Sequence, residues 1–164
     1  GLKGQPRNAA SVAPRFDEDL AKLRNSFGGA YGTAGQWLTL SDGLARQGKT
    51  KEAANVLVAA LRSSPEDATL WVGLGNALMQ PGGLLSPAAD YSYRQAIRVA
   101  PQSAAGPFFR GLALASSGQF REARTIWTDL LARLPEKAPL HAQLQADIKR
   151  LDLLLERQSD PAGR

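Results

Sequence analysis

Cysteine is absent from this chain of 164 residues, and its absence excludes several kinds of site. A disulfide framework, a thiolate zinc site and a thiol nucleophile all need cysteine. The single histidine, His141, has no metal-ligating side chain at helical spacing around it, and a metal site needs several ligands. We therefore predict no metal and no cofactor, and we expect a structural role for His141.

Long apolar runs and clusters of basic residues are also missing. A membrane-spanning helix needs about 18 or more consecutive apolar residues, and no such run occurs. The net charge is +5, from 20 Lys and Arg against 15 Asp and Glu, but the cations are scattered singly. Dispersed charge is typical of a solvated helical surface, so the sequence does not indicate a nucleic-acid partner.

Aromatic residues are few, at 7%, while apolar residues make up 43% of the chain and are largely alanine and leucine. This mixture favours closely packed helices over a β-sandwich. No Ser–His–acid order or nucleophile elbow is present. The Gly82-Gly83 pair does not form a phosphate loop, because no lysine follows it and no strand precedes it. We therefore predict that the protein is not an enzyme.

A repeat of about 34 residues runs through most of the chain. Trp37 and Trp71 mark it, and so do Pro65, Pro101 and Pro135. This is the period of tetratricopeptide repeats (TPRs). Each interval reads as helix–turn–helix, with small residues where two helices approach closely and bulky residues between neighbouring helices. The small residues are Ala53, Gly75, Ala89, Gly111 and Ala123, and the bulky ones are Trp37, Trp71, Tyr93 and Trp127.

These patterns predict an all-α fold, a TPR-like α-solenoid of about three helix–turn–helix repeats with an N-terminal helix and a C-terminal capping helix. We expect a single domain over residues 14–158, with repeats at about 34–67, 68–103 and 104–137 and a capping helix at about 139–158. Residues 1–13 and 159–164 are expected to be flexible tails. In the second repeat, Ser86 is expected to cap the helix that begins at Pro87.

The functional surface of such an array is expected to be the concave groove lined by the first helix of each repeat. The predicted peptide-binding residues are Leu38, Asp42, Arg46, Val72, Asn76, Met79, Phe108 and Leu112. Asn76 alone matches the lysine–asparagine clamp with which chaperone-tail binders of this class hold a terminal carboxylate. The lining is mainly apolar and suits an amphipathic helix or an apolar segment. For Phe108 and Phe109, packing between repeats is the alternative.

The segment from Gly82 to Pro135 resembles the TPR domain of cytochrome c-type biogenesis proteins of the CcmH/CcmI group. In that family a Gly-Gly-x-Leu-Ser/Thr-Pro turn leads into a helix that ends near an Ala-Pro pair. A third repeat follows, with Gly-x-Ala, Gly-x-Phe/Tyr, Glu-Ala, a Trp and Leu-Leu-x-x-Leu-Pro. The corresponding residues are Gly82 to Pro87, Ala100-Pro101, Gly111 to Ala113, Gly118 to Phe120, Glu122-Ala123, Trp127 and Leu130 to Pro135. The opening GLKGQP is similar to the segment that follows the membrane helices in that family.

The resemblance implies a periplasmic domain of a protein anchored in the inner membrane, and we expect the anchoring segment to lie outside these residues. It implies that the domain binds apocytochrome c, largely through the C-terminal helix of the apocytochrome, and presents it to the haem-ligation machinery. Other cytochrome c maturation proteins are then the further partners. The alternative is a generic TPR scaffold that joins folded proteins in the cell envelope.

Overall fold

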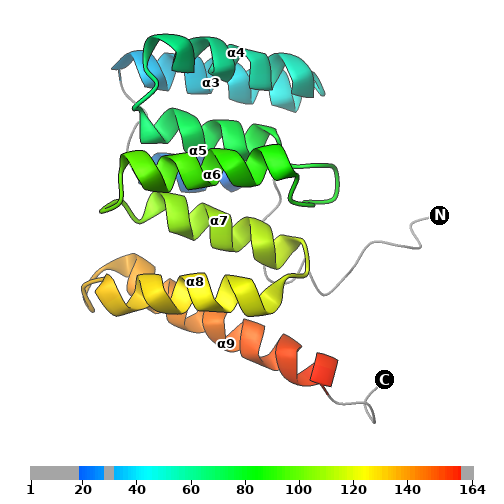
Figure 1. The fold of residues 1–164 in the computed structure, drawn as a ribbon, viewed down its shortest axis with the longest axis vertical. Coiled ribbons are helices and arrows are strands. Elements are labelled where there is room, and N and C mark those ends of the chain that lie inside the picture. Colours follow the sequence, from blue (N-terminus) through cyan, green and yellow to red (C-terminus); the bar gives the residue numbers. More distant parts are fainter. Residues whose placement is uncertain (1–18, 28–31, 160–164) are drawn as a thin grey trace, which may run out of the picture.

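The computed structural model describes residues 19–27 and 32–159, which form a stack of helices (Figure 1). These are α2 (Asp19–Ser26), α3 (Gly32–Arg46), α4 (Thr50–Ser63), α5 (Ala68–Ala77), α6 (Pro87–Val99), α7 (Ala105–Ser116), α8 (Phe120–Arg133) and α9 (Pro139–Ser159). Within these ranges the only β feature is an isolated bridge between Gln80 and Leu84. The all-α prediction is confirmed. The expected tail at 1–13 and residues 160–164 lie outside the described residues.

Consecutive helices pack in pairs, α3 with α4, α5 with α6 and α7 with α8. The second helix of each pair ends just before one of the three repeat prolines, α4 at Ser63, α6 at Val99 and α8 at Arg133. A proline disfavours the helical conformation in the residue before it and cannot donate a backbone hydrogen bond. The prolines therefore end the second helices, as predicted.

Glycines with positive φ make the tight turns inside the first and third pairs. Gly48 and Gly118 have φ angles of 80° and 81°. After each glycine, the next residue donates its backbone N–H back into the first helix, Lys49 to the Leu44 carbonyl at 2.9 Å and Gln119 to the Leu114 carbonyl at 2.8 Å. This is the Schellman arrangement, which satisfies the free carbonyls at a helix end.

The longer turn of the second pair is held by side-chain hydrogen bonds. The Ser86 hydroxyl accepts from the Ala89 N–H at 3.0 Å and donates to the Leu78 carbonyl at 2.7 Å. Ser86 is thus the N-cap of α6, with Pro87 in its first turn, as predicted. The Leu85 N–H also donates to the Ser117 hydroxyl at 2.6 Å, which ties this turn to the end of α7.

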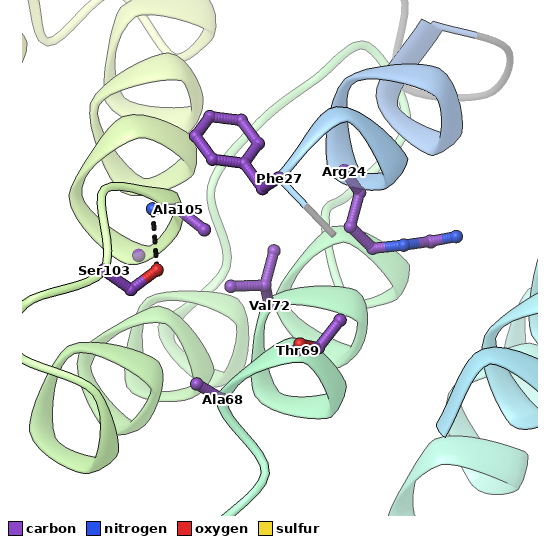
Figure 2. A pocket seen from close by; sticks show the side chains of 8 residues that line it. Arg24, Phe27, Ala68, Thr69, Val72, Ser103 and Ala105 are labelled. Atoms are coloured by element: carbon purple, nitrogen blue, oxygen red, sulfur yellow. Dashed lines mark hydrogen bonds between the residues drawn. The ribbon is translucent and has the colours of Figure 1, made fainter. Parts of the chain in front are cut away.

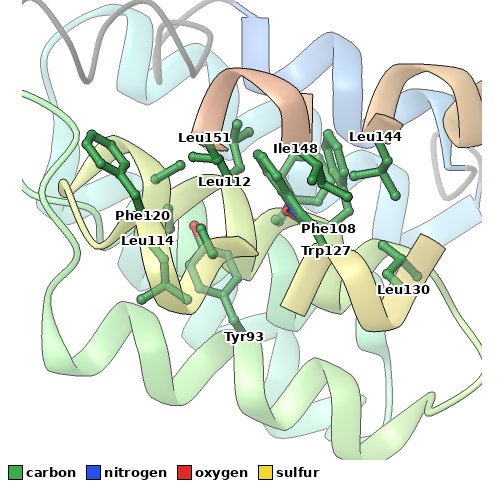
Figure 3. Close-up of a cluster of buried hydrophobic side chains, with 14 of the residues drawn as sticks. Tyr93, Phe108, Leu112, Leu114, Phe120, Trp127, Leu130, Leu144, Ile148 and Leu151 are labelled. Carbon is green, nitrogen blue, oxygen red and sulfur yellow. Dashed lines mark hydrogen bonds between the residues drawn. The ribbon is translucent and has the colours of Figure 1, made fainter. Parts of the chain in front are cut away.

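A small residue facing a large ring sets the spacing between the two helices of a pair. An alanine side chain at position 75 would place its Cβ 2.5–2.9 Å from three ring carbons of Tyr93. At position 111 it would overlap the indole of Trp127, whose Nε1–H donates to the Phe108 carbonyl at 3.1 Å. Tyr93 and Trp127 are fully buried in the main core, which α9 covers at one end (Figure 3).

We predict that Gly75→Ala destabilises the fold although alanine is the better helix former. The added methyl group has no space beside the Tyr93 ring, and overpacking a core costs about 1–3 kcal/mol. The matched control is Gly43→Ala in α3, where the new Cβ would meet only the tip of Arg46 at 3.9 Å. This change is expected to stabilise by up to about 1 kcal/mol. Urea unfolding followed by circular dichroism measures both values, and equal effects would contradict the close-approach explanation.

Trp37 departs from its predicted role of filling a gap between neighbouring helices. It is 37% exposed and Leu40 on the same helix is 49% exposed, whereas Trp71 at the equivalent position of the next repeat is partly buried. Trp71 is covered because α5 packs on α4 of the preceding pair. In the described part of the chain no helix of an earlier repeat covers α3 in this way. The prediction for Trp37 was therefore wrong.

The last helix, α9, covers the C-terminal end of the stack by packing on α8. Its buried stripe consists of Leu144, Ile148, Leu151 and Leu154. Asp147 lies in the same face and is also buried, with Arg150 Nη1 at 3.1 Å from its carboxylate. Burial raises the pKa of the Asp147 carboxyl above its ordinary value, against the opposing effects of Arg150 and Gln143. Among the described helices, α9 included, none is long and apolar enough to span a membrane.

We predict that Asp147→Asn stabilises the protein at pH 7. A pKa raised in the folded state means that the folded protein binds this proton more tightly than the unfolded chain, so stability is lost as pH rises through the folded pKa. The uncharged amide avoids that loss. Thermal unfolding should show a higher Tm for the variant at pH 7, and the difference should shrink below about pH 4, near the ordinary pKa of aspartate. Asp129→Asn on the exposed face of α8 is the control. A difference between Asp147→Asn and the parent chain that does not change with pH would contradict the prediction.

Candidate peptide-binding groove

The first helices of the three pairs lie side by side, with α5 between α3 and α7. The short helix α2 lies on the surface that these helices share, which we call the groove. In Figure 1 the blue ribbon of α2 is visible behind α5 and α6. It contacts α5 directly, and its side chains reach α3 on one side and α7 on the other. An element of the chain itself thus occupies the predicted ligand surface.

Apolar side chains hold α2 at the α7 side of the groove. Leu20 is buried in the main core, and Leu23 and Phe27 pack against it. The Phe27 ring centroid lies 5.4 Å from that of Phe108 and 5.5 Å from that of Phe109. These separations and tilted geometries are favourable for aromatic pairs. Phe27, the residue that follows the end of α2, is therefore the aromatic anchor of this helix.

One ion pair holds α2 at the α3 side. The guanidinium of Arg24 donates two hydrogen bonds to the Asp42 carboxylate, at 3.0 and 2.7 Å. The Arg24 side chain is 5% exposed and that of Asp42 is 22% exposed. Bidentate pairs of this kind are stronger and more directional than single-point ion pairs. Asp42 was predicted as a groove residue, and its carboxylate is engaged by the chain's own arginine.

A small cavity remains between α2 and the groove (Figure 2). Its lining residues are Arg24, Phe27, Ala68, Thr69, Val72, Ser103, Ala105 and Gly106. Arg24 and Phe27 extend from α2 in opposite directions, one on each side of this space. Its volume of about 40 Å³ holds a few water molecules. This cavity is therefore too small to admit a second helix beside α2.

The predicted groove residues divide into a buried and a partly accessible set. The apolar residues Leu38, Val72, Phe108 and Leu112 are each at most 2% exposed. Val72, Phe108 and Leu112 belong to the main core, and Leu38 to a second cluster among α3, α4 and α5. Phe108 therefore packs in the core in this conformation, which is the alternative to a groove position that the sequence left open for it. The prediction that the set binds a peptide stays a prediction.

The polar and partly accessible residues of the set have defined neighbours. Asn76 accepts a hydrogen bond from the Tyr93 hydroxyl at 2.7 Å. Burial, followed by the charge of Asp90, raises the pKa of Tyr93 well above its ordinary value, so the hydroxyl stays a donor. Met79 is partly buried against the main core, and Arg46 is exposed at the end of α3. The side-chain oxygen of Asn76 is thus engaged, whereas its buried side-chain nitrogen has no hydrogen-bond partner among the described residues, and the binding role of Asn76 stays a prediction.

Two residues that contact the groove most directly, Arg24 and Phe27, were not among the predicted site residues. Phe27 has the helical spacing of the apolar positions in α2, but spacing does not show which surface a helix covers. Arg24 carries no sequence signal of burial, because arginine is usually exposed. Both contacts depend on how α2 lies across the array.

Comparison with known proteins agrees with this architecture. Residues 38–104 match the family model described as tetratricopeptide repeat. Among solved structures, the Yersinia enterocolitica type III secretion translocator chaperone SycD is similar with a TM-score of 0.56 and 22% identity, over 76% of this chain and 86% of that chain. No curated protein matches the sequence.

The fold is therefore a TPR-like helical array, as predicted. The repeat match over residues 38–104 is typical of a protein-binding module. In the residues that the structure describes, no group of three or more His, Asp or Glu side chains could hold a metal ion. The groove can bind through apolar contact, aromatic packing and one carboxylate.

We predict that Asp42→Asn loosens α2 without unfolding the array. The substitution removes the charge that Arg24 faces, and hydrogen bonds to charged groups are worth about 1.5–3 kcal/mol. Amide hydrogen exchange in residues 20–26 should become roughly 10–100-fold faster, while exchange in α7 and α8 should not change. The control is Asp152→Asn, which breaks the exposed pair with Arg124 and should have little effect. Unchanged exchange in α2 would show that the ion pair does not hold it.

Proposed function

We propose that the protein binds an amphipathic helix of a protein client in the groove formed by α3, α5 and α7. One observation carries this proposal: the groove already holds an amphipathic helix, α2, through apolar contacts and a bidentate ion pair. Helix-in-groove recognition uses the same combination of apolar anchors and a few polar contacts. The groove thus has the shape and chemistry for a helical ligand.

As the particular client we propose apocytochrome c, bound through its C-terminal helix by a periplasmic domain of a membrane-anchored cytochrome c maturation factor. The resemblance of the Gly82–Pro87 turn and of the third repeat to that family supports this proposal. The charge of the groove supports it as well, because the residue that faces α2 is the acid Asp42 and not a lysine. A carboxylate at this position favours a helix with a basic side chain over a terminal carboxylate.

A generic scaffold in the cell envelope is the second candidate, and the exposed apolar side chains of the first helix pair favour it. Trp37, Leu40 and Val58 are exposed on the first helix pair. Trp37 and Leu40 are three residues apart on α3 and so are neighbours on its surface, and neighbouring exposed apolar side chains can mark a protein–protein contact. Such a contact would join a folded partner to the end of the array and would leave the groove unused.

Peptide titration separates these functions. A fluorescent peptide with the sequence of an apocytochrome c C-terminal helix should bind, and a scrambled peptide of equal composition should bind at least tenfold more weakly, a difference of about 1.4 kcal/mol. Equal or absent binding of the two peptides would contradict the apocytochrome proposal.

The binding surface is tested with a variant that fills the groove. Ala105→Arg places a long side chain in the cavity that Ala105 lines, and we expect about tenfold weaker binding of the apocytochrome peptide. The matched control is Ala59→Arg on the exposed face of α4. Substitution of Phe108 or Val72 is unsuitable, because both are core residues whose truncation costs several kcal/mol of stability. Equal affinity of Ala105→Arg and Ala59→Arg would place the site elsewhere.

A further inference from the structure

The contacts of α2 show what the groove recognises. Arg24, in the last turn of α2, reaches Asp42 on α3, and Phe27, the turn residue that follows α2, reaches Phe108 and Phe109 on α7. These two side chains extend to opposite sides of the groove (Figure 2), because Arg24 lies within the helix and Phe27 lies in the turn after it. The pair therefore spans the width of the groove, from the first repeat to the third.

The charge on the groove makes the arginine position selective. The helices α3, α5 and α7 contain one acidic residue in total, Asp42. The remaining charged residues of these helices are Arg46 and Arg110, and Arg110 pairs with Asp90 of α6 at 2.7 Å. A ligand cation thus has one carboxylate on these helices to bind, which fixes its direction and register. Phe108 and Phe109 then set the place of an aromatic side chain one turn away.

We propose that the groove recognises a helix with an arginine in its last turn and an aromatic residue three positions after that arginine, and that α2 is a resident occupant which such a partner helix displaces. This inference rests on the proposed helix-binding function and names the chemistry of the partner. Only molecules whose groove is free of α2 can bind the partner. The apparent affinity of the partner is therefore its intrinsic affinity multiplied by the fraction of such molecules. Release of α2 opens the site.

Two features make α2 a replaceable occupant rather than a fixed part of the core. It has eight residues, and helices shorter than about 12 residues are marginal on their own in water. Its seat is also imperfect. Within the described residues, the buried Nε–H of Arg24 has no hydrogen-bond partner, and an unpaired buried donor destabilises the state that buries it. A partner helix whose arginine forms a hydrogen bond through its Nε–H as well would bind the groove more tightly than α2 does.

The test uses the full chain and a fluorescein-labelled peptide of residues 19–27, DLAKLRNSF. In the chain, Arg24→Gln together with Phe27→Ser releases α2 and leaves every residue of α3, α5 and α7 unchanged. We expect the peptide to bind this released chain at least tenfold more tightly than the parent chain. Equal binding to both chains, or binding to neither, would overturn the proposal. Circular dichroism verifies folding, and the milder single variant Arg24→Gln should give an intermediate gain.

Recognition of the arginine is tested by substituting Arg24 in the peptide and Asp42 in the chain. A peptide in which Arg24 is replaced by glutamine should bind the released chain about tenfold more weakly than the parent peptide. When Asp42→Asn is added to the released chain, the two peptides should bind equally, because the carboxylate that distinguishes them is gone. A preference for arginine that persists without Asp42, or no preference at all, would contradict the assigned contact.

The outcomes also separate this inference from the proposed function. Binding of the residue 19–27 peptide to the released chain, with no binding of the apocytochrome peptide to either chain, supports the recognition chemistry and rejects the client. Equal binding of the apocytochrome peptide to the parent and released chains supports the client and rejects α2 as a competing occupant.

Discussion

The close approach of paired helices, a small residue against a large ring, is the constraint on which the rest of the structure depends. Gly75 faces Tyr93 and Gly111 faces Trp127 with no space for a methyl group between them. These contacts set the spacing of α5 from α6 and of α7 from α8, and the Trp127 indole is further fixed by its hydrogen bond to the Phe108 carbonyl. With the pairs held rigidly, the first helices line up and present one continuous surface.

That surface is apolar because α3, α5 and α7 each have apolar residues on two faces. One face packs on the second helix of the pair, and the other lines the groove. A repeat array has no internal element that covers the groove, so the groove stays open unless a helix from elsewhere lies on it. In this protein α2 buries it, through Leu20 and Phe27 on one side and Arg24 on the other. The same physical property, an apolar surface with one carboxylate, accounts for both the intramolecular contact and the proposed binding of a client.

Much of the architecture was predictable because the repeat is local. The turn glycines Gly48 and Gly118, the cap at Ser86 and the prolines act on residues only a few positions away. The small and large core positions recur at a fixed interval, so one repeat indicates the next. Trp37 shows where this reasoning fails. The repeat pattern predicts that a preceding helix would cover this side chain, but it does not show whether such a helix is present, and Trp37 is exposed.

By itself, then, the sequence determined the helices, their pairing and the apolar character of the first-helix surface, since each depends on short-range hydrogen bonding and on a periodic pattern of residue size. Only the tertiary structure decided that this surface is covered, that Asp42 pairs with Arg24, and that Phe27 packs on Phe108. Those contacts join residues far apart in the chain, and the helical period of α2 is compatible with many places on the array. Shape and charge complementarity across the groove select one of them.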